Sequence, residues 1–252
     1  MPRTYAVVGE DLRQRWLAAL LEARGIPVLR PADFCTPANV LLLPVPTVTK
    51  AGTLSGTAIP FPAFLRSLPS GTEIWGSGLT PFYQEAQQAN LTLNDFTSHE
   101  LFASENALPT AEGALQLAME ELPATIRGSS FLVIGFGRIG KQLAHLLDAL
   151  GGFVTVARQQ GEAPPYRTDT TGSYRYPLQK YDAIFNTVPA PVFSEEHCLQ
   201  TSPDCLLIDL ASQPGGIAKT TARKLIHALG LPAKTSPKTA AEIMLRILLK
   251  EE

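Results

Sequence analysis

Short runs of apolar residues alternate along the chain with longer stretches in which apolar residues recur every three or four positions. In the first part of the chain the runs predict buried strands, and the periodic stretches predict helices. Strands are expected over residues 5–9, 26–29, 39–44 and 73–76, and helices over residues 12–23, 61–68 and 81–90. Buried strands that alternate with helices are typical of a parallel sheet covered on both faces. We therefore expect an N-terminal α/β domain over residues 1–105.

A longer amphipathic stretch, residues 109–122, separates this domain from a second series of the same kind. Strands are expected over residues 131–134, 153–157, 183–187 and 205–210, and helices over residues 139–150 and 217–229. Residues 159–177 are polar and contain proline and glycine, so they leave little room for a regular crossover helix. We expect a connector helix followed by a second α/β domain, together spanning residues 106–236.

The last helix is marked by its first two residues. Ser236 suits the N-cap position, and Pro237 suits the first helical position. Its apolar stripe consists of Ala240, Ile243, Met244, Ile247 and Leu248. Because this helix, residues 237–250, lies beyond the last strand of the second domain, we expect it to pack back on the N-terminal domain.

Composition and charge exclude several classes of protein. The 252 residues include 21 basic and 23 acidic side chains, which give a formal charge of −2 and no basic footprint for nucleic acid. The longest apolar run, residues 40–48, contains two prolines and is far shorter than the ~20 residues of a membrane span. The N-terminus becomes polar at Glu10, unlike a signal peptide. We expect a cytoplasmic protein that binds neither nucleic acid nor membrane.

The cysteines suggest neither a disulfide framework nor a metal site. Cys35, Cys198 and Cys205 are odd in number and form no Cys-x-x-Cys pair. We expect no bound metal.

A glycine-rich loop supplies the first candidate chemistry. Gly135, Gly137 and Gly140 have the spacing Gly-x-Gly-x-x-Gly, which is weak on its own but here follows an apolar strand and opens an amphipathic helix. The first glycine allows a tight turn, the second lets backbone approach a pyrophosphate, and the third lets helix and strand pack closely. A glycine turn without a ligand is the alternative. The loop residues expected to bind the cofactor are Gly135, Phe136, Gly137, Arg138, Ile139 and Gly140.

The fold class expected is therefore α/β with two doubly wound domains, joined by a long connector helix. The second is a Rossmann dinucleotide-binding domain. An NAD enzyme usually carries an acid at the end of its second strand, where it accepts a hydrogen bond from the ribose. This chain has Arg158 there, which suits the 2′-phosphate of NADP. We therefore favour NADP as the cofactor, with NAD as the alternative. Arg158 could also be a solvated surface arginine with no role in binding.

Two later strand ends are expected beside the same ligand, because ligands bind outside the carboxyl ends of parallel strands. Both ends carry small residues that allow a nicotinamide ribose to approach. The expected cofactor contacts there are Thr187, Val188, Pro189, Asp209 and Ala211.

Several blocks of sequence together carry a family resemblance. They are Pro-Thr-Ala-Glu-Gly at residues 109–113, the glycine loop at residues 135–141, Asp-Leu-Ala-Ser-Gln-Pro-Gly-Gly at residues 209–216 and Ser-Pro-Lys-Thr-Ala at residues 236–240. In this order and spacing the chain resembles the A subunits of dipicolinate synthases. Its two-domain plan also resembles the formate/glycerate dehydrogenase-like enzymes.

The resemblance implies an oxidoreductase that converts dihydrodipicolinate, or its hydroxylated tetrahydro precursor, to dipicolinate by hydride transfer to a nicotinamide. It also implies a partner in the form of a flavoprotein-like B subunit, a homo-oligomer and a place in the mother cell during sporulation. A substrate with two carboxylates needs cations or N–H donors around it.

Four residues are candidates for catalysis or substrate contact. Ser212 offers a hydroxyl, and Lys238 is a cation at a helix start, where it opposes the helix dipole. Thr110 begins the connector helix, and His99 precedes it. Capping, a solvated charge or an ordinary structural role is the alternative for these residues.

Two other functions compete with this interpretation. One is a hydroxy-acid or amino-acid dehydrogenase of the same plan, which would need a catalytic pair that the sequence does not identify. The other is a catalytically inactive nucleotide-binding or scaffold subunit, which the short segment 159–177 favours.

Overall fold

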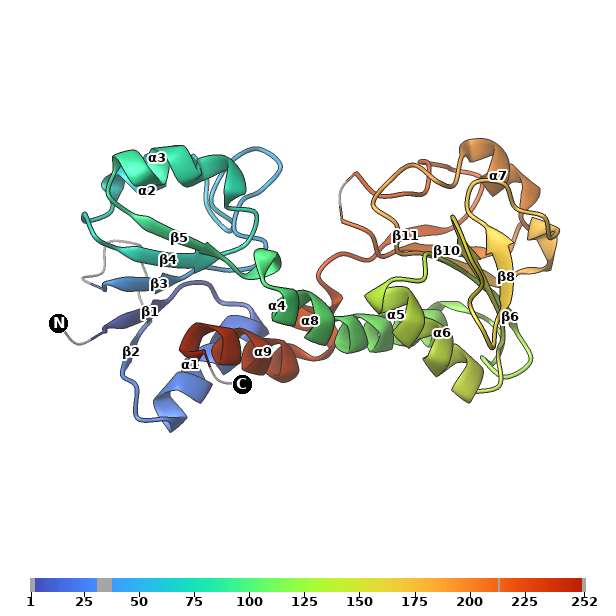
Figure 1. Ribbon diagram of the computed structural model, residues 1–252, viewed down its shortest axis with the longest axis horizontal. Helices are drawn as coiled ribbons and strands as arrows, with labels where there is room; N and C mark the ends of the chain where they lie inside the picture. The colour runs from blue at the N-terminus through green and yellow to red at the C-terminus, as the bar shows by residue number, and fades with distance from the viewer. Residues whose placement is uncertain (1–2, 31–37, 213, 251–252) are drawn as a thin grey trace. The chain divides into compact units, whose positions relative to one another are not determined.

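The computed structural model describes residues 3–30, 38–212 and 214–250, and these form two compact units (Figure 1). Unit 1 contains the residues up to Asn106 together with those from Pro232 onward, and unit 2 contains Ala107–Leu231. Each unit is built on one parallel sheet. Cys35 and Gln213 lie outside the described residues.

Unit 1 has a five-stranded sheet in the order β2-β1-β3-β4-β5. The strands are β1 (Tyr5–Val7), β2 (Val28–Leu29), β3 (Val40–Leu42), β4 (Glu73–Gly76) and β5 (Thr92–Asp95). The helices are α1 (Leu12–Ala23), α2 (Phe61–Ser67), α3 (Tyr83–Gln88), α4 (Glu100–Glu105) and α9 (Pro237–Leu249), with single 3₁₀ turns η1 (Thr80–Phe82) and η2 (Phe96–Ser98).

The two faces of this sheet bury alternate residues of the same strands. Tyr5 and Val7 pack with α1 and α9 on one face, and Ala6 packs with α2 and α3 on the other (Figure 1). Because side chains alternate along a strand, both faces of the short strands are apolar. The last helix, α9, thus completes the core of unit 1 against α1.

Unit 2 has a six-stranded sheet in the order β11-β10-β9-β6-β7-β8. The strands are β6 (Ser130–Ile134), β7 (Phe153–Arg158), β8 (Arg167–Thr170), β9 (Ala183–Asn186), β10 (Leu206–Asp209) and β11 (Leu225–His227). The helices are α5 (Ala107–Glu121), α6 (Arg138–Ala149) and α7 (Glu195–Gln200), with the turn η3 (Leu178–Lys180); α8 (Leu231–Thr235) follows the last strand.

Helices cover both faces of the second sheet as well. α5 and α6 pack against Phe131 and Val133, whereas η3 and α7 pack against Leu132 and Ile134. The expectation of an α/β fold with two doubly wound domains is confirmed by these two parallel sheets. No helix among the described residues is long and apolar enough to cross a membrane.

One predicted element is wrong. Residues 217–229 were expected to form a helix, but they form bends and the edge strand β11, so His227 lies in a strand. The free edge of β10 pairs with Leu225–His227. Arg223 donates from Nε to Thr201 Oγ1 at 2.9 Å and from Nη2 to the Thr201 carbonyl at 2.7 Å, which fixes the approach. Tertiary pairing here overrides the helix propensity of alanine, lysine and leucine.

Candidate dinucleotide site

The turn between β6 and α6 is built around its glycines. Gly135 has a φ of +97°, and a Cβ there would lie 2.3 Å from Oγ1 of Thr187. A Cβ on Gly140 would lie 2.2 Å from the Gly135 carbonyl oxygen. Both positions therefore exclude a side chain, because the helix and the next strand end pack directly on the turn. Gly137 differs, since no atom lies within 4 Å of a Cβ built there.

This open position lies at the start of α6. Gly137 is the N-cap of this helix and offers no side-chain acceptor to its first turn. Helix N-termini carry unpaired N–H groups and the positive end of the dipole. Arg138 is exposed and Ile139 half-buried in this first turn. The arrangement fits the pyrophosphate of a dinucleotide, which such turns bind through backbone N–H groups.

A pocket of about 590 Å³ opens beside this turn. It is lined by Gly135, Phe136, Gly137, Arg158, Gln159, Gln160, Thr171, Thr187, Val188 and Pro189. Among these described lining residues none is acidic, and Arg158 carries the charge. The carboxyl ends of β6, β7, β8 and β9 all contribute to the pocket, which is the expected location for a ligand of a doubly wound sheet.

Two cations share the ring of Phe136. Nζ of Lys141 and Cζ of Arg158 each lie 5.7 Å from the ring centroid. Nη1 of Arg158 donates to the Glu162 carbonyl oxygen at 2.7 Å. Within the described part of the chain neither cation has a carboxylate in ion-pair distance, so this corner of the pocket is positively charged.

The carboxylate of Asp209, at the end of β10, organises the loop that follows. Oδ1 accepts from Asn186 Nδ2 at 2.8 Å and from the Ala211 amide at 3.1 Å. Oδ2 accepts from the amides of Gly216 at 2.8 Å and Ile217 at 3.1 Å. Asp209 is completely buried. All four donors belong to the protein, so this carboxylate acts on the protein's own loop.

Asn186 extends the same network to the neighbouring strand end. Its Nδ2 donates to the Val188 carbonyl at 3.0 Å, and its Oδ1 accepts from the Val188 amide at 3.1 Å. A Cβ on Gly216 would lie 2.4 Å from Nδ2 of Asn186, which explains the second glycine of the Pro-Gly-Gly turn. Thr187 Oγ1 donates to the Ile134 carbonyl at 2.9 Å. Thr187, Val188 and Pro189 are thereby fixed beside the glycine turn.

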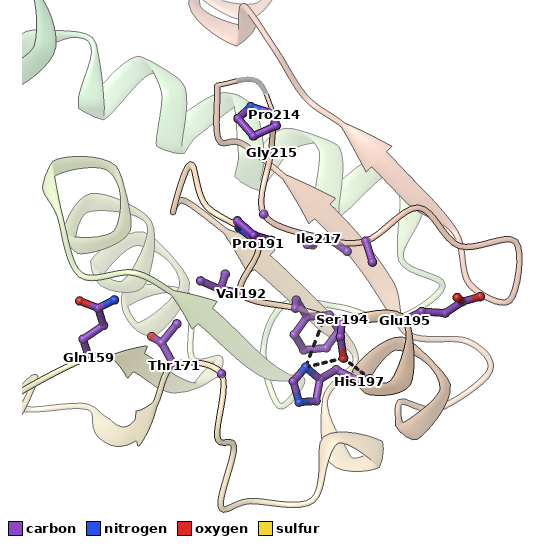
Figure 2. Close-up of a pocket in the computed structure, with 14 residues that line it drawn as sticks. Gln159, Thr171, Pro191, Val192, Ser194, Glu195, His197, Pro214, Gly215 and Ile217 are labelled. Atoms are coloured by element: carbon purple, nitrogen blue, oxygen red, sulfur yellow. Dashed lines mark hydrogen bonds between the residues drawn. The ribbon is translucent and has the colours of Figure 1, made fainter.

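A second, more apolar pocket of about 710 Å³ adjoins the first and shares Gln159 and Thr171 with it. Figure 2 shows these two side chains at one side of this pocket and Pro214, Gly215 and Ile217 at another. His197 also lines it, but its Nδ1 accepts from the Ser194 amide at 3.1 Å in the capping box of α7. This histidine therefore has a structural role at the helix start.

The four catalytic candidates are divided between the units. Ser212 is exposed in the loop held by Asp209, and its carbonyl accepts from the Gly215 amide at 2.9 Å. Thr110 is half-buried in the first turn of α5. Ser212 thus lies in the same loop as Ala211, an expected cofactor contact, whereas Thr110 lies in a separate element of unit 2.

His99 and Lys238 both belong to unit 1 and stack on different tryptophans. His99 is exposed and lies 5.8 Å from Trp75, centroid to centroid. Nζ of Lys238 lies 5.5 Å from the ring of Trp16 and 3.8 Å from Glu242. Ser236, before this helix, occupies the N-cap position without a side-chain capping bond, and Pro237 begins the helix.

Lys141 and Asn186 lie in segments that the sequence predicts at the site, but neither is among the contacts expected from the sequence. Lys141 could have been found from its position one residue after the last glycine of the loop. Asn186 could have been found from its position at the end of a fully buried apolar strand, where a polar side chain must find partners.

Comparison with known proteins identifies a relative that aligns with part of the chain. No family model matches the chain. The chain is 33% identical over 189 residues to the A subunit of dipicolinate synthase from Bacillus subtilis, covering 69% of this chain and 63% of that protein. The aligned part is therefore less than two thirds of the length of the curated relative.

Solved structures match over nearly the whole chain. The crystal structure of the dipicolinate synthase A subunit from Bacillus halodurans has a TM-score of 0.84 at 24% identity and covers 98% of this chain and 97% of its own. That of the Bacillus subtilis protein has a TM-score of 0.78 at 25% identity, with 99% and 95% covered. D-lactate dehydrogenase from Escherichia coli has a TM-score of 0.64 at 12% identity, with 98% and 95% covered, which shows the shared fold.

The two parallel sheets and the glycine turn match the two-domain, Rossmann-type fold of the dehydrogenase structures. Within this class the chain is a relative of the dipicolinate synthase A subunits. The resemblance expected from the sequence blocks at residues 109–113, 135–141 and 209–216 is thereby confirmed.

Proposed function

We propose that this protein is the A subunit of a dipicolinate synthase and oxidises dihydrodipicolinate, or its hydroxylated tetrahydro precursor, to dipicolinate with NADP. The observation that carries the proposal is the open approach at Gly137 beside the cation of Arg158. The identity to a relative named as a dipicolinate synthase component supports the substrate.

The chemistry is the loss of two electrons and two protons from the dihydropyridine ring. When bound, the nicotinamide would take one ring hydrogen as hydride, and the other would leave as a proton to a base or to water. The hydroxylated precursor must also lose water before the ring becomes aromatic. Because aromatisation favours the product, the main task of the protein is to position the ring, which contributes several kcal/mol when the reacting atoms are aligned.

NADP is favoured over NAD by the charge of the pocket. Arg158 uses one N–H group for the Glu162 carbonyl, so other guanidinium N–H groups are left for a 2′-phosphate. Lys141 adds a second positive charge at the same aromatic ring. With no acidic residue among the described lining, a ribose 2′-hydroxyl would lack the carboxylate acceptor typical of NAD enzymes.

The remaining roles follow from position. Ser212 would donate to the nicotinamide or the substrate, because it lies in the loop after β10. Thr110, Lys238 and His99 are candidates for substrate contact. The expected partner is a flavoprotein-like B subunit. The expected setting is the mother-cell cytoplasm, with the protein itself forming a homo-oligomer.

The test is an assay of the purified protein on freshly generated dihydrodipicolinate, with and without the B subunit. Dipicolinate is followed by its ultraviolet absorbance and NADPH by its own. We expect equal amounts of the two products, with NADP used better than NAD. Absence of dipicolinate under both conditions would refute the proposed reaction.

A further inference from the structure

An arginine is buried at the carboxyl edge of the sheet in unit 1. Arg13 lies in the first turn of α1, directly after β1, and only 4% of its surface is exposed. One Nη2 N–H group donates to the carbonyl of Val45. Nε is buried without a partner, and Nη1 has no hydrogen bond to the described residues. Most of the hydrogen-bonding capacity of this guanidinium is therefore unused by the described residues.

Arg13 forms no ion pair with the residues that the structure describes. The one carboxylate that acts on its charge, Asp11, accepts from the Gln14 amide at 3.0 Å. Burial lowers the pKa of Arg13, since it disfavours the charged form. An uncompensated buried charge destabilises the fold. The single hydrogen bond to the Val45 carbonyl could be made by a neutral donor, so it does not explain why a charged side chain is buried here. A ligand of opposite charge would supply the missing partner.

Arg15, two residues further along α1, has the opposite surroundings. Its side chain is 61% exposed, and its Nη2 lies 3.2 Å from the Glu10 carboxylate. The two arginines share a helix turn, but only Arg13 is buried and without an ion pair to a described residue. Burial and unused donors therefore distinguish Arg13 from an ordinary surface arginine.

Gln14, the residue after Arg13, attaches the first turn of α1 to the sheet. Its Nε2 donates to the carbonyls of Val8 at 2.8 Å and Leu42 at 3.1 Å, at the ends of β1 and β3. The start of α1 is thereby fastened to both strand ends. A fixed guanidinium loses less conformational entropy on binding than a mobile one.

Ser77 is hydrogen-bonded to the turn at residues 45–47, which also contains the carbonyl that accepts from Arg13. The amide of Ser77 donates to Thr47 Oγ1 at 2.8 Å, and the Thr47 amide donates to Ser77 Oγ at 3.3 Å. The Ser77 hydroxyl hydrogen is left without an acceptor among the described residues. The turn at residues 45–47 thus connects a buried cation and an unused hydroxyl donor.

We infer that Arg13 binds a carboxylate of a small dicarboxylic acid, with Ser77 as an accompanying donor. The planar guanidinium matches a carboxylate in shape and charge. That the acid is dipicolinate or its dihydro precursor rests on the proposed function. The carboxylate site itself rests on unit 1 alone.

Calorimetric titration of the full-length protein tests this inference. The probes are dipicolinate, isophthalate, which has the same two carboxylates on a ring without nitrogen, and the neutral dipicolinic diamide. We expect the two acids to bind and the diamide not to bind. Arg13→Gln should weaken binding of the acids about 10- to 100-fold, the usual effect of losing a charge-assisted hydrogen bond. Arg15→Gln is the matched control and should bind as the unaltered protein does.

Two further measurements distinguish loss of the site from loss of the fold. NADPH binding, followed by its fluorescence, should be the same in all variants. Arg13→Lys keeps the charge and a donor for Val45 but not the fork, so it should fold and bind the acids more weakly than arginine does. Binding of isophthalate through Arg13 without any oxidation of dihydrodipicolinate would support the site and refute the proposed reaction. The inference is overturned if neither acid binds, or if Arg13→Gln and Arg15→Gln behave alike.

Discussion

At the scale of single residues, substitution of Arg158 tests the proposed preference for NADP over NAD. Arg158→Gln should reduce affinity for NADPH about 10- to 100-fold and leave affinity for NADH nearly unchanged, because only the former has a 2′-phosphate for the guanidinium to bind. Fluorescence titration with both dinucleotides measures the two affinities. Arg167→Gln is the control, since Arg167 stacks on Tyr176 at 5.2 Å and lines no part of the dinucleotide pocket. Equal losses for both dinucleotides would remove the specificity argument.

The buried carboxylate of Asp209 should contribute to the free energy of unfolding. Asp209→Asn replaces one acceptor oxygen by an NH₂ group, so a donor must face either Asn186 Nδ2 and the Ala211 amide or the amides of Gly216 and Ile217. Each buried donor left without an acceptor costs about 1–3 kcal/mol. We expect the free energy of unfolding to fall by about 2–4 kcal/mol in urea titrations. Asp204→Asn, at an exposed position, should change it little.

At the scale of the element, the β6–turn–α6 unit separates two kinds of glycine. Gly140→Ala places a methyl group 2.2 Å from the Gly135 carbonyl oxygen, so it should destabilise the protein by about 1–3 kcal/mol. Gly137→Ala meets no atom within 4 Å, so it should fold normally and weaken dinucleotide binding by filling the approach to the helix N-terminus. Thermal unfolding and NADPH titration measure the two effects. A Gly137→Ala protein that binds NADPH unchanged would contradict the location of the pyrophosphate.

The β6–turn–α6 unit could be predicted from the sequence, whereas the edge strands β5, β8 and β11 could not. The apolar run at residues 131–134 and the glycine spacing act locally, so both strand and turn could be inferred. β8 consists of Arg-Thr-Asp-Thr and β5 of Thr-Leu-Asn-Asp, which are polar edge strands without an apolar signature. β11 depends on the free edge of β10 for its conformation. Pairing across the chain, which single-sequence periodicity does not record, determines these elements.

The candidate site follows the same division between local and long-range causes. The glycine turn and Arg158 lie next to predicted elements and could be proposed from the sequence. The network of Asp209, Asn186 and Gly216 joins residues far apart in the chain and required the fold. Arg13 was also not proposed, because its burial and missing partners are tertiary properties.

At the scale of the whole molecule, each unit has its own cores on the two faces of its own sheet. The chain begins in unit 1, forms unit 2 from a single continuous segment and returns through α9 to the core of unit 1. A ligand that binds one unit should therefore stabilise mainly that unit. This makes the two proposed sites separable in the intact protein.

Hydrogen exchange followed by mass spectrometry tests this separation. NADPH at about 100 times its dissociation constant should stabilise its unit by about 2.7 kcal/mol, which slows exchange of the core amides in β6, β9 and β10 about 100-fold if they exchange through unfolding of the unit. Core amides of β1, β3 and β4 should exchange as before. A dicarboxylate held by Arg13 should produce the opposite pattern, and Arg13→Gln should abolish it. Equal protection of both sheets by NADPH would show that the units unfold together.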